Sequence, residues 1–391
     1  MSWRERLGRN WGRLGMRFNI WKDCPKVPIT ELLSFIVDNR GKTVPTADDG
    51  WKLIATNCVT NNTLFPVYEK VRYLTQETYE TWFRAHPMPG DILFVNKGTP
   101  GRVCLVPDPV DFCIAQDMIA LRADDEKIYN KYLFAVLRSR EIQQQIYNTN
   151  VGDVIPHFKK QFMDQLLIPV PDRRIQEIIG NLYYELSYKT ELNKKINNNL
   201  EQQAQAIYQQ MFIENQNPNW KEGKLSDLVA VKYGKDHKKL DGGCYPVYGS
   251  GGIMRYVEKP LYTGESVLIP RKGTLNNVMY VNGAFWSVDT MFYTEMLRPN
   301  IAKFVYHFVK GKDLASLNAG SAVPSMTTNI LNAMPLYVPD DETLSIFEET
   351  VTPMYSQMQE NEKQSANLAN IRDTLLPRLM SGELEVSDID L

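Results

Sequence analysis

The sequence predicts an α+β fold in which two similar globular domains are joined by two long helices and the second half of the chain repeats the first. Three observations predict this class. The stretches 173–213 and 341–380 carry apolar residues at helical spacing. Each follows a block of mixed sequence with strand-like alternation. The second block and its helix match the first at a nearly fixed offset, which indicates a duplication and hence pseudo-twofold symmetry.

Length and composition are those of a folded protein with several domains. At 391 residues the chain exceeds the usual size of one domain, and its hydrophobic fraction of 43% is ordinary. No apolar run reaches the roughly 18 residues that a membrane span needs, so we expect no membrane partner. The five cysteines include no CxxC pair. This argues against a disulfide framework and a zinc site and fits a reducing cytoplasm.

The net charge of −2 gives no global basic signature of a nucleic-acid binder. Any contact with DNA must therefore come from local patches or from basic partner subunits. One patch is the N-terminal arm, residues 1–26, whose first 20 residues carry Arg4, Arg6, Arg9, Arg13 and Arg17 against the single acid Glu5. Such an arm can contact phosphates. We favour a disordered leader, with Met16 as the more usual start.

The first mixed block, 27–172, alternates strand and turn patterns. Turn residues at Lys97–Gly101 lie between two apolar runs and predict a β-hairpin. In chain order we expect strands at 51–54 and 71–74, a helix at 76–83, the hairpin within 90–107, a strand at 113–121 and a helix at 128–147.

The central helix, 173–213, would be roughly 60 Å long at 1.5 Å per residue, which is typical of a spacer. Asn215, Asn217 and Pro218 end it in a linker, 214–219. The distal helix, 341–380, contains Pro353, which should kink the helix or mark its true start. A tail, 381–391, begins with Gly382-Glu383-Leu384, much as Gly223-Lys224-Leu225 follows the first helix. The two ends of the chain are therefore expected near each other.

The second mixed block, 220–340, repeats the first. Lys272-Gly273-Thr274 matches Lys97-Gly98-Thr99, and Ser287–Phe292 with Asp289 matches Ala115–Ala120 with Asp117. The segment GSAVPSMTTNILNAMPLYVP (320–339) matches GDVIPHFKKQFMDQLLIPVP (152–171). Gly320, Pro324, Pro339 and Met380 lie 168 positions after Gly152, Pro156, Pro171 and Phe212.

Motifs for catalysis are incomplete. Gly41-Lys42-Thr43 lacks the earlier glycine of a phosphate-binding loop, because Ile36 stands there. Asn217-Pro218-Asn219-Trp220 lacks the second proline of an adenine methyltransferase, and Gly249–Gly252 is better explained as a turn. Glu222-Gly223-Lys224 is too short a pattern to indicate a nuclease. The four histidines are scattered, so neither a metal site nor a catalytic triad is supported.

Candidate DNA-binding residues gather in two zones of each half. Lys, Arg and Asn suit phosphates and base edges, although solvated loops also carry them. The first zone comprises Arg40, Lys42 and Thr43, matched by Lys232, Lys235, His237, Lys238 and Lys239. The second comprises Asn96, Lys97, Thr99 and Arg102, matched by Arg271, Lys272, Thr274, Asn276 and Asn277.

The order of several motifs resembles the specificity subunits of type I restriction–modification systems. The resemblance covers nearly the whole chain from about Met16. The matching segments are Arg40–Thr43, Gly90–Leu93, Pro169–Pro171 with Gln176, Tyr245–Gly252, Val338-Pro339, Ile371–Pro377 and Leu379–Leu384. The chain departs from the family at Asp340–Leu344, where a Glu-Gln pair is usual, and at Gln176-Glu177, where the order is shifted.

The resemblance implies two target-recognition domains that each read half of a split site in double-stranded DNA. The long helices would pack antiparallel as a coiled coil and set the spacing of the half-sites. Two methyltransferase subunits would dock on the helices and bring S-adenosylmethionine. An endonuclease subunit, which uses ATP and Mg, is a further partner that the sequence leaves open. This chain itself would be non-catalytic and carry no cofactor.

Two other readings stay open at this point. One is the specificity subunit of a related methyltransferase–nuclease without a motor, which the neighbouring genes would distinguish. The other is a helical scaffold that does not bind DNA. The near-neutral charge favours the scaffold, and the Lys/Asn/Thr-rich turns at matched positions favour DNA.

Overall fold

The computed structural model describes residues 19–149, 156–317 and 325–384. The arginines of the arm, the repeat residues Gly152, Gly320 and Pro324, and the tail from residue 385 lie outside these ranges. The chain divides into two compact units. Unit 1 comprises residues 1–195 and 361–391, and unit 2 comprises residues 196–360. Each unit therefore holds one mixed block and a part of both long helices.

Unit 1 is built on small sheets. An antiparallel sheet has the order β2-β8-β5-β6, a second has the order β4-β3-β7, and β1 pairs with β9. Its elements before the long helix are α2 (Ile20–Asp23), β1 (Lys26–Pro28), η1 (Ile29–Leu32), β2 (Leu33–Val37), β3 (Trp51–Ile54), η2 (Thr56–Cys58), β4 (Arg72–Leu74), α3 (Gln76–Thr81), β5 (Ile92–Val95), β6 (Val103–Leu105), β7 (Phe112–Ile114), β8 (Met118–Ala123), α4 (Asn130–Leu137), α5 (Arg140–Asn148), η3 (Lys160–Gln165) and β9 (Leu167–Pro169).

Two elements predicted for this block are wrong. The single strand expected at 113–121 is two strands in different sheets, because the chain turns at Gln116, which has a φ of 39°. The single helix expected at 128–147 is two helices, because Ser139 begins a new one by accepting a hydrogen bond from the Ile142 amide. The predicted hairpin is confirmed, with Leu93 opposite Cys104.

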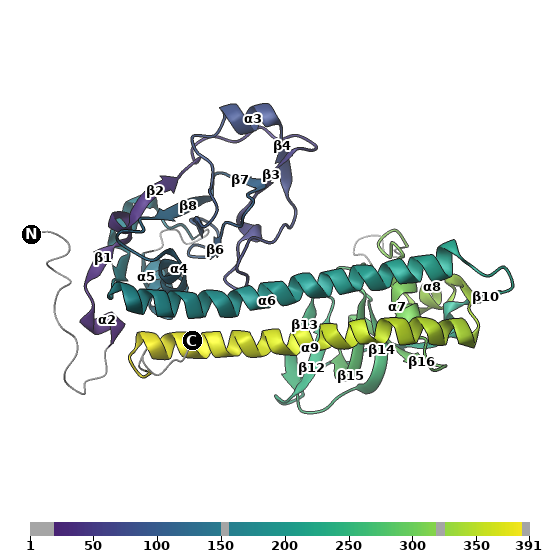
Figure 1. The fold of residues 1–391 in the computed structure, drawn as a ribbon. Coiled ribbons are helices and arrows are strands. Elements are labelled where there is room, and N and C mark those ends of the chain that lie inside the picture. The colour runs from purple at the N-terminus through teal and green to yellow at the C-terminus, as the bar shows by residue number, and fades with distance from the viewer. Residues whose placement is uncertain (1–18, 150–155, 318–324, 385–391) are drawn as a thin grey trace, which may run out of the picture. The chain divides into compact units, whose positions relative to one another are not determined.

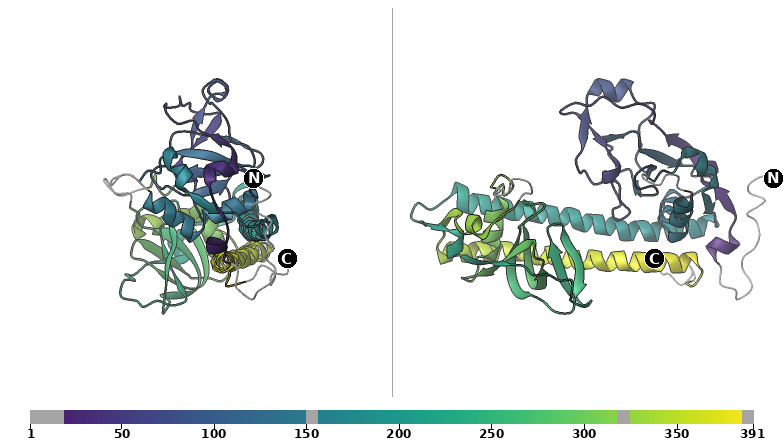
Figure 2. Two further views of the ribbon diagram at one scale, coloured as in Figure 1. Left: turned by 90° about the vertical axis from the view of Figure 1, so that its left-hand side faces the viewer. Right: turned by 180° about the vertical axis from the view of Figure 1, so that it is seen from behind.

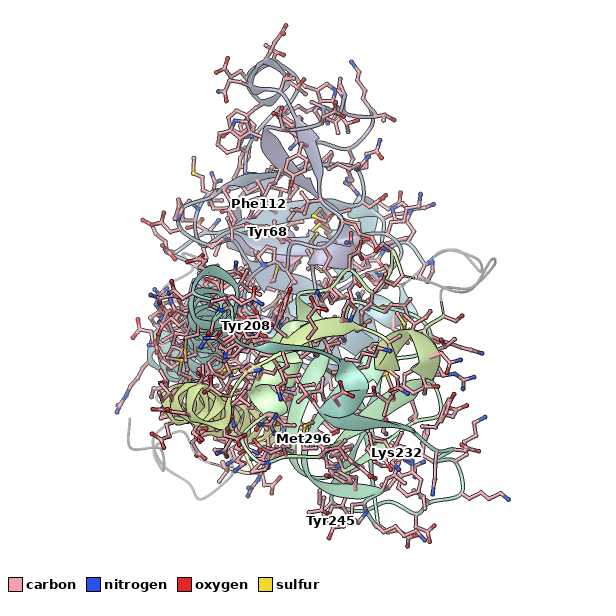
Figure 3. All side chains as sticks on the ribbon, turned by 90° about the vertical axis from the view of Figure 1, so that its right-hand side faces the viewer. Tyr68, Phe112, Tyr208, Lys232, Tyr245 and Met296 are labelled. Carbon is pink, nitrogen blue, oxygen red and sulfur yellow. The ribbon has the colours of Figure 1, made fainter. Side chains whose placement is uncertain are left out.

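The core of unit 1 joins sheet and helices. Phe94 and Tyr132 are fully buried and belong to one cluster with Ile179 of the long central helix and Leu376 of the distal one. The Tyr132 hydroxyl donates a 2.8 Å hydrogen bond to the Pro169 carbonyl, so its one polar atom is satisfied inside the core. A separate cluster includes Phe112, whose ring meets Tyr68 edge-on at 6.3 Å (Figure 3).

Unit 2 has one six-stranded sheet with the order β11-β16-β14-β15-β12-β13, while β10 pairs with β17. Its elements between the long helices are β10 (Lys221–Lys224), η5 (Leu225–Asp227), β11 (Val229–Tyr233), β12 (Tyr245–Gly249), β13 (Gly252–Val257), β14 (Tyr262–Pro270), β15 (Met279–Ser287), β16 (Met291–Met296), α7 (Ala302–Lys310), α8 (Thr328–Asn332) and β17 (Pro335–Val338). The right-hand view of Figure 2 shows this sheet beside the unit's parts of the long helices.

Aromatic side chains dominate the core of unit 2. Phe212 stacks edge-on against Phe304 at 4.8 Å and against Phe347 at 5.1 Å. These three rings come from the end of the central helix, from α7 and from the distal helix. The core therefore fixes both helices to the mixed block of unit 2.

Strand pairing confirms the internal repeat and the predicted fold class. The order β2-β8-β5-β6 recurs as β11-β16-β14-β15, and the isolated bridge Lys97–His157 recurs as Lys272–Ser325. The register corrects one predicted match, because Val95 pairs with Met118 as Pro270 pairs with Met291. Asp289 therefore corresponds to Gln116 and not to Asp117.

The long helices are α6 (Arg173–Tyr208), continued by a π-helical segment at Gln209–Glu214, and α9 (Asp341–Met380) (Figure 1). Of the two outcomes expected for Pro353, a kink or the true start of the helix, the second is wrong, because α9 begins at Asp341 as its predicted bounds have it and runs through Pro353 as one element. In unit 1, Arg372 contacts Ser187 and Gln364 contacts Asn193, so the helices run antiparallel there. In unit 2, Asn197 bonds to the Met358 carbonyl and Tyr208 packs on Phe347, which gives the same direction.

Candidate nucleic-acid interface

In unit 1 the two predicted zones meet at the turn between β7 and β8. The Asp117 carbonyl accepts hydrogen bonds from the amides of Asn96 at 2.8 Å and Lys97 at 3.3 Å. The Gln116 side chain donates to the Lys42 carbonyl at 3.1 Å and to the Thr43 hydroxyl at 3.2 Å. The loops that follow β2 and β5 are thus held against one short segment. Gln116, which sequence analysis missed, is the residue that joins them.

Four basic groups converge at this place. Lys97 forms the isolated bridge with His157. Burial lowers the pKa of His157, and the positive charges of Arg40, Lys97 and Lys159 lower it further. Arg40 is partly neutralised by Asp38 at 2.8 Å, whereas Lys97 faces solvent. This end of unit 1 therefore brings the cations Arg40, Lys97 and Lys159 together against the carboxylates of Asp38 and Asp117.

His157 and Lys159 were not among the predicted residues. Both flank Phe158, whose amide donates a 2.8 Å hydrogen bond to the Asn96 carbonyl. The repeat aligns Phe158 with Met326, whose amide likewise donates to the Arg271 carbonyl at 2.9 Å. Both residues lie in the repeated segment that ends each block, so the sequence did mark them as part of the repeat. Nothing in that pattern indicated that this segment lies beside the loops.

Some predicted residues hold the loop and do not face solvent. Asn96 is fully buried, and its amide donates to the Phe158 carbonyl at 3.2 Å. The Thr99 carbonyl accepts from the Arg102 amide and closes the turn. Lys42, Thr43 and Arg102 are exposed on the same loops. In unit 1 the side chains free to meet a ligand are therefore mainly basic.

Unit 2 repeats this framework around the segment Ser287–Met291. The Ser287 carbonyl accepts a hydrogen bond from the Lys235 amide at 2.8 Å. The Thr290 carbonyl accepts from the amides of Arg271 at 2.9 Å and Lys272 at 3.3 Å, as Asp117 does in unit 1. Both predicted zones of unit 2 are therefore brought together as well.

The side chains on this framework differ from those in unit 1. The Arg271 guanidinium lies 5.4 Å from the ring centre of Tyr233, a cation–π contact that holds the arginine at the surface. Lys272 and Thr274 are exposed beside it, and the loop after β11 exposes Lys235, Lys238 and Lys239, with His237 half-buried among them.

Three predicted residues of unit 2 have partners within the protein. Lys232, labelled in Figure 3, lies on β11 with its ammonium 3.6 Å from Glu295. Asn276 donates to Asp313 at 3.0 Å and accepts from the Ala315 amide. Asn277 donates to the Ser250 carbonyl at 2.7 Å. The two asparagines fix the loop that carries Arg271 and Lys272.

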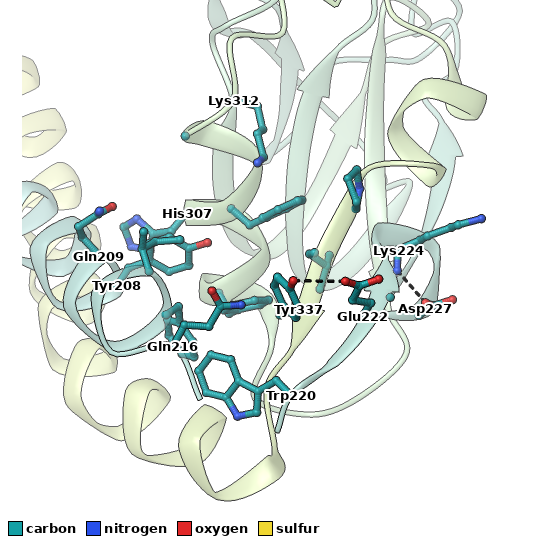
Figure 4. Close-up of a pocket in the computed structure, with 18 of the residues that line it drawn as sticks. Tyr208, Gln209, Gln216, Trp220, Glu222, Lys224, Asp227, His307, Lys312 and Tyr337 are labelled. Atoms are coloured by element: carbon teal, nitrogen blue, oxygen red, sulfur yellow. Dashed lines mark hydrogen bonds between the residues drawn. The ribbon is translucent and has the colours of Figure 1, made fainter. Parts of the chain in front are cut away.

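Unit 2 also contains a cavity of about 940 Å³ at the end of α6, apart from the loop clusters (Figure 4). Tyr208, Phe212 and Trp220 form its aromatic wall, and no predicted DNA-binding residue lines it. His307, also in the wall, bonds to Gln205 at 2.7 Å through Nδ1 and to the Tyr355 hydroxyl at 2.9 Å through Nε2. Burial lowers the pKa of His307 to about 4, so it is neutral at pH 7.

Two searches of the described residues bear on other functions. Across 19–149, 156–317 and 325–384, His, Cys, Asp and Glu side chains nowhere gather in threes as a metal site would require. Within the same ranges no helix is both long and apolar enough to cross a membrane.

The chain thus contains two similar α+β units with matched loop clusters, and each unit includes a part of the antiparallel helix pair. The chain matches the family described as type I restriction modification DNA specificity domain over residues 27–202 and again over 217–367. It therefore belongs to this family, and the resemblance seen in its sequence is confirmed.

Individual relatives are distant in sequence. The MjaIX specificity subunit of Methanocaldococcus jannaschii is 19% identical over 345 residues, which cover 77% of this chain and 79% of that one. The HindI specificity subunit of Haemophilus influenzae is 24% identical over 180 residues, or 46% of this chain and 34% of that one. The solved S subunit of a type I system from M. genitalium superimposes with a TM-score of 0.57 at 18% identity, covering 93% of this chain and 98% of the other.

Proposed function

We propose that this chain acts without catalysis of its own, as the subunit that selects the DNA sequence for a type I restriction–modification complex in the cytoplasm. One observation carries the proposal. The same backbone hydrogen bonds present the loop after β5 in unit 1 and the loop after β14 in unit 2, while the side chains on those loops differ. The same loop backbone with different exposed side chains is expected if each unit reads a different half of the target.

The proposed division of work follows from side-chain type and exposure. Exposed lysines such as Lys97 and Lys272 suit phosphate oxygens and would position each unit on the duplex. Thr43, Thr274 and Arg271 offer the hydroxyl and bidentate guanidinium groups that discriminate base edges. Near-neutral net charge then leaves most of the electrostatic affinity to these clusters and to partner subunits.

The proposed partners supply the chemistry. Two methyltransferase subunits would bind along α6 and α9 and bring S-adenosylmethionine, and an endonuclease subunit would bring ATP and Mg. The helices support this role because they are shared between the units and expose apolar residues, such as Leu192, Ile346 and Ile371, on an otherwise polar surface. We propose no cofactor site in this chain.

The test is a base-resolution map of adenine methylation in the host genome, with this gene intact and deleted. We expect one split motif, two short half-sites around a fixed unspecified gap, to lose methylation in the deletion strain. Restoring the gene on a plasmid should restore methylation at that motif only. An unchanged map in a strain whose methyltransferase partner is active would refute the proposal.

A further inference from the structure

The hairpin of β12 and β13 exposes apolar side chains next to the cationic loop of unit 2. Ile253 and Met254 follow its two-residue tip and are 51% and 61% exposed. β13 is the last strand of its sheet, and β12 joins the hairpin to that sheet through a short parallel pairing with β15 at Val247 and Tyr248. Two adjacent large apolar side chains are therefore available to a ligand that meets the cationic loop.

A bulge sets the position of Met254. Val247 pairs with Arg255 and Tyr248 pairs with Ile253, so Met254 is the extra residue between them. Bulges redirect a side chain that regular pairing would place elsewhere. Gly249 makes room for it, because a Cβ on Gly249 would lie 2.5 Å from the Met254 sulfur. The Met254 side chain thus lies over Gly249 and remains exposed.

The hairpin tip is fastened to the loop that carries Arg271 and Lys272. Asn277 of that loop donates a 2.7 Å hydrogen bond to the Ser250 carbonyl at the tip. Gly273, with a φ of 87°, lies so close to the tip that a Cβ there would stand 2.9 Å from the Ser250 hydroxyl. The apolar side chains that follow the tip and the loop that carries Arg271 and Lys272 therefore form one continuous surface.

We propose that the β12–β13 hairpin enters the major groove of one half-site, where Ile253 and Met254 contact the C5 methyl groups of thymine. This inference rests on the function proposed above and deepens it. The major groove admits a two-stranded β-ribbon, and the thymine methyl is the apolar group on its floor. Arg271 and Lys272 on the fastened loop would hold the flanking phosphates.

The experiment compares the full chain, assembled with its methyltransferase subunits, with two variants. The double variant Ile253→Ser/Met254→Ala removes the two exposed apolar side chains of the hairpin. The control variant Leu297→Ala removes an apolar side chain of similar exposure, 57%, which directly follows the last residue of β16. Each complex selects from a duplex library in which both half-sites are randomised. The selected duplex is then tested with uracil in place of each thymine.

We expect the hairpin variant to lose its preference at one or two A·T positions of a single half-site, while the other half-site and the Leu297→Ala profile stay unchanged. Uracil at those positions should weaken wild-type binding about fourfold per methyl and leave the hairpin variant unaffected. An unchanged preference, or equal weakening at every position, would overturn the inference. If the wild-type complex selects no split motif, the proposed function itself fails.

Discussion

At the scale of residues, the loop clusters contain two groups of side chains. One group points inward and holds the loops in place, and the other group faces solvent. Asn96 and Asn277 point inward and bond to backbone carbonyls, whereas Lys97 and Lys272 face solvent on the same loops. The supporting amides keep the loop geometry, and the outward cations are free to bind anions. These two groups should give different results when mutated.

Lys97→Gln should weaken binding of the assembled complex to all duplexes by a similar factor. Loss of one phosphate contact lowers the slope of log affinity against log salt by about one. Titration of specific and unrelated duplexes at several salt concentrations measures both effects. Lys127→Gln, which removes a lysine paired with Asp124 at 2.9 Å, is the matched control and should change neither. A loss confined to one sequence would assign Lys97 to base recognition.

His307 makes the stability of unit 2 depend on pH. Its pKa is about 4 in the folded chain, against an ordinary value of 6.5, because burial disfavours the charged ring. As the pH falls, His307 therefore becomes protonated in the unfolded chain before it does so in the folded chain. Its contribution to the free energy of unfolding is fully present above pH 6.5 and is lost as the pH falls to about 4. The loss amounts to about 3 kcal/mol.

His307→Phe should abolish that part of the pH dependence. His307 already packs against the rings of Tyr208 and Phe347, so an aromatic ring fits the fold there. At pH 7 the variant should be less stable by about 1–3 kcal/mol, because Gln205 and Tyr355 lose their partner. Urea unfolding at pH 7 and pH 5 measures both. A variant whose stability falls between these pH values as steeply as that of the wild type would contradict the assignment.

Sequence reasoning located the loops better than it assigned their side chains. Lys97, Lys272 and Arg271 do lie on matched loops, because the repeated Lys-Gly-Thr turn indicates their place directly. The burial of Asn96 was not predictable from that turn, since it depends on Phe158, sixty-two residues away. Gln116 and His157 were missed for the same reason, as each meets its partner only through the fold.

At the scale of elements, a buried amide links the helix pair within unit 1. Asn193 of α6 is 5% exposed and donates to Gln364 at 2.9 Å, to Ser365 at 3.1 Å and to the Asn361 carbonyl at 3.3 Å. A buried asparagine between helices favours one register, because any shift leaves it without partners. The bond network therefore specifies how α6 and α9 align in this unit.

Asn193→Ala should lower the free energy of unfolding by about 1–3 kcal/mol, since the acceptors on α9 lose their donor. The midpoint of urea unfolding measures the effect. Asn198→Ala, on the exposed face of the same helix, should change stability by less than about 0.5 kcal/mol. Equal effects of the two variants would show that the Asn193 bonds do not stabilise the pair.

Long elements were predictable and short ones were not. An apolar stripe sustained over many turns leaves little ambiguity, so both long helices were foreseen. The breaks at Gln116 and Ser139 are short polar interruptions between apolar runs, and the prediction continued a single element across each of them. At Pro353 the error was the opposite one, because the prediction allowed the helix to begin at a residue through which it in fact continues. This proline lies on the exposed face of α9, and the burial of Val351 and Tyr355 on the other face outweighs the cost of about 3 kcal/mol for an interior proline.

At the scale of the whole molecule, the two blocks should be exchangeable. Replacing residues 220–340 with the corresponding block of another family member should change one half-site and leave the other and the gap as they were. Methylation mapping of the hybrid strain gives the result. A change in both half-sites would show that the units do not read independently.

The gap between half-sites should follow the length of the helices. Inserting one helical turn after Lys195 in α6 and after Glu360 in α9, where the units divide, adds about 5 Å, or about one or two base pairs of duplex. We expect a longer gap with unchanged half-sites in the methylation map. The same insertion in α6 alone is the control and should disrupt assembly. A functional double insertion with the old gap would show that something else sets the spacing.

The loops of both units are anchored through main-chain amides and carbonyls, at Asp117 and at Thr290, and through a few inward side chains such as Asn96 and Asn277. Main-chain groups are the same in every amino acid except proline, so most substitutions on these loops leave the anchoring intact. Mutation can therefore alter what a unit recognises without first weakening its fold. A gene of this design can acquire new target sequences by small steps, and can do so in one half while the other continues to serve the cell.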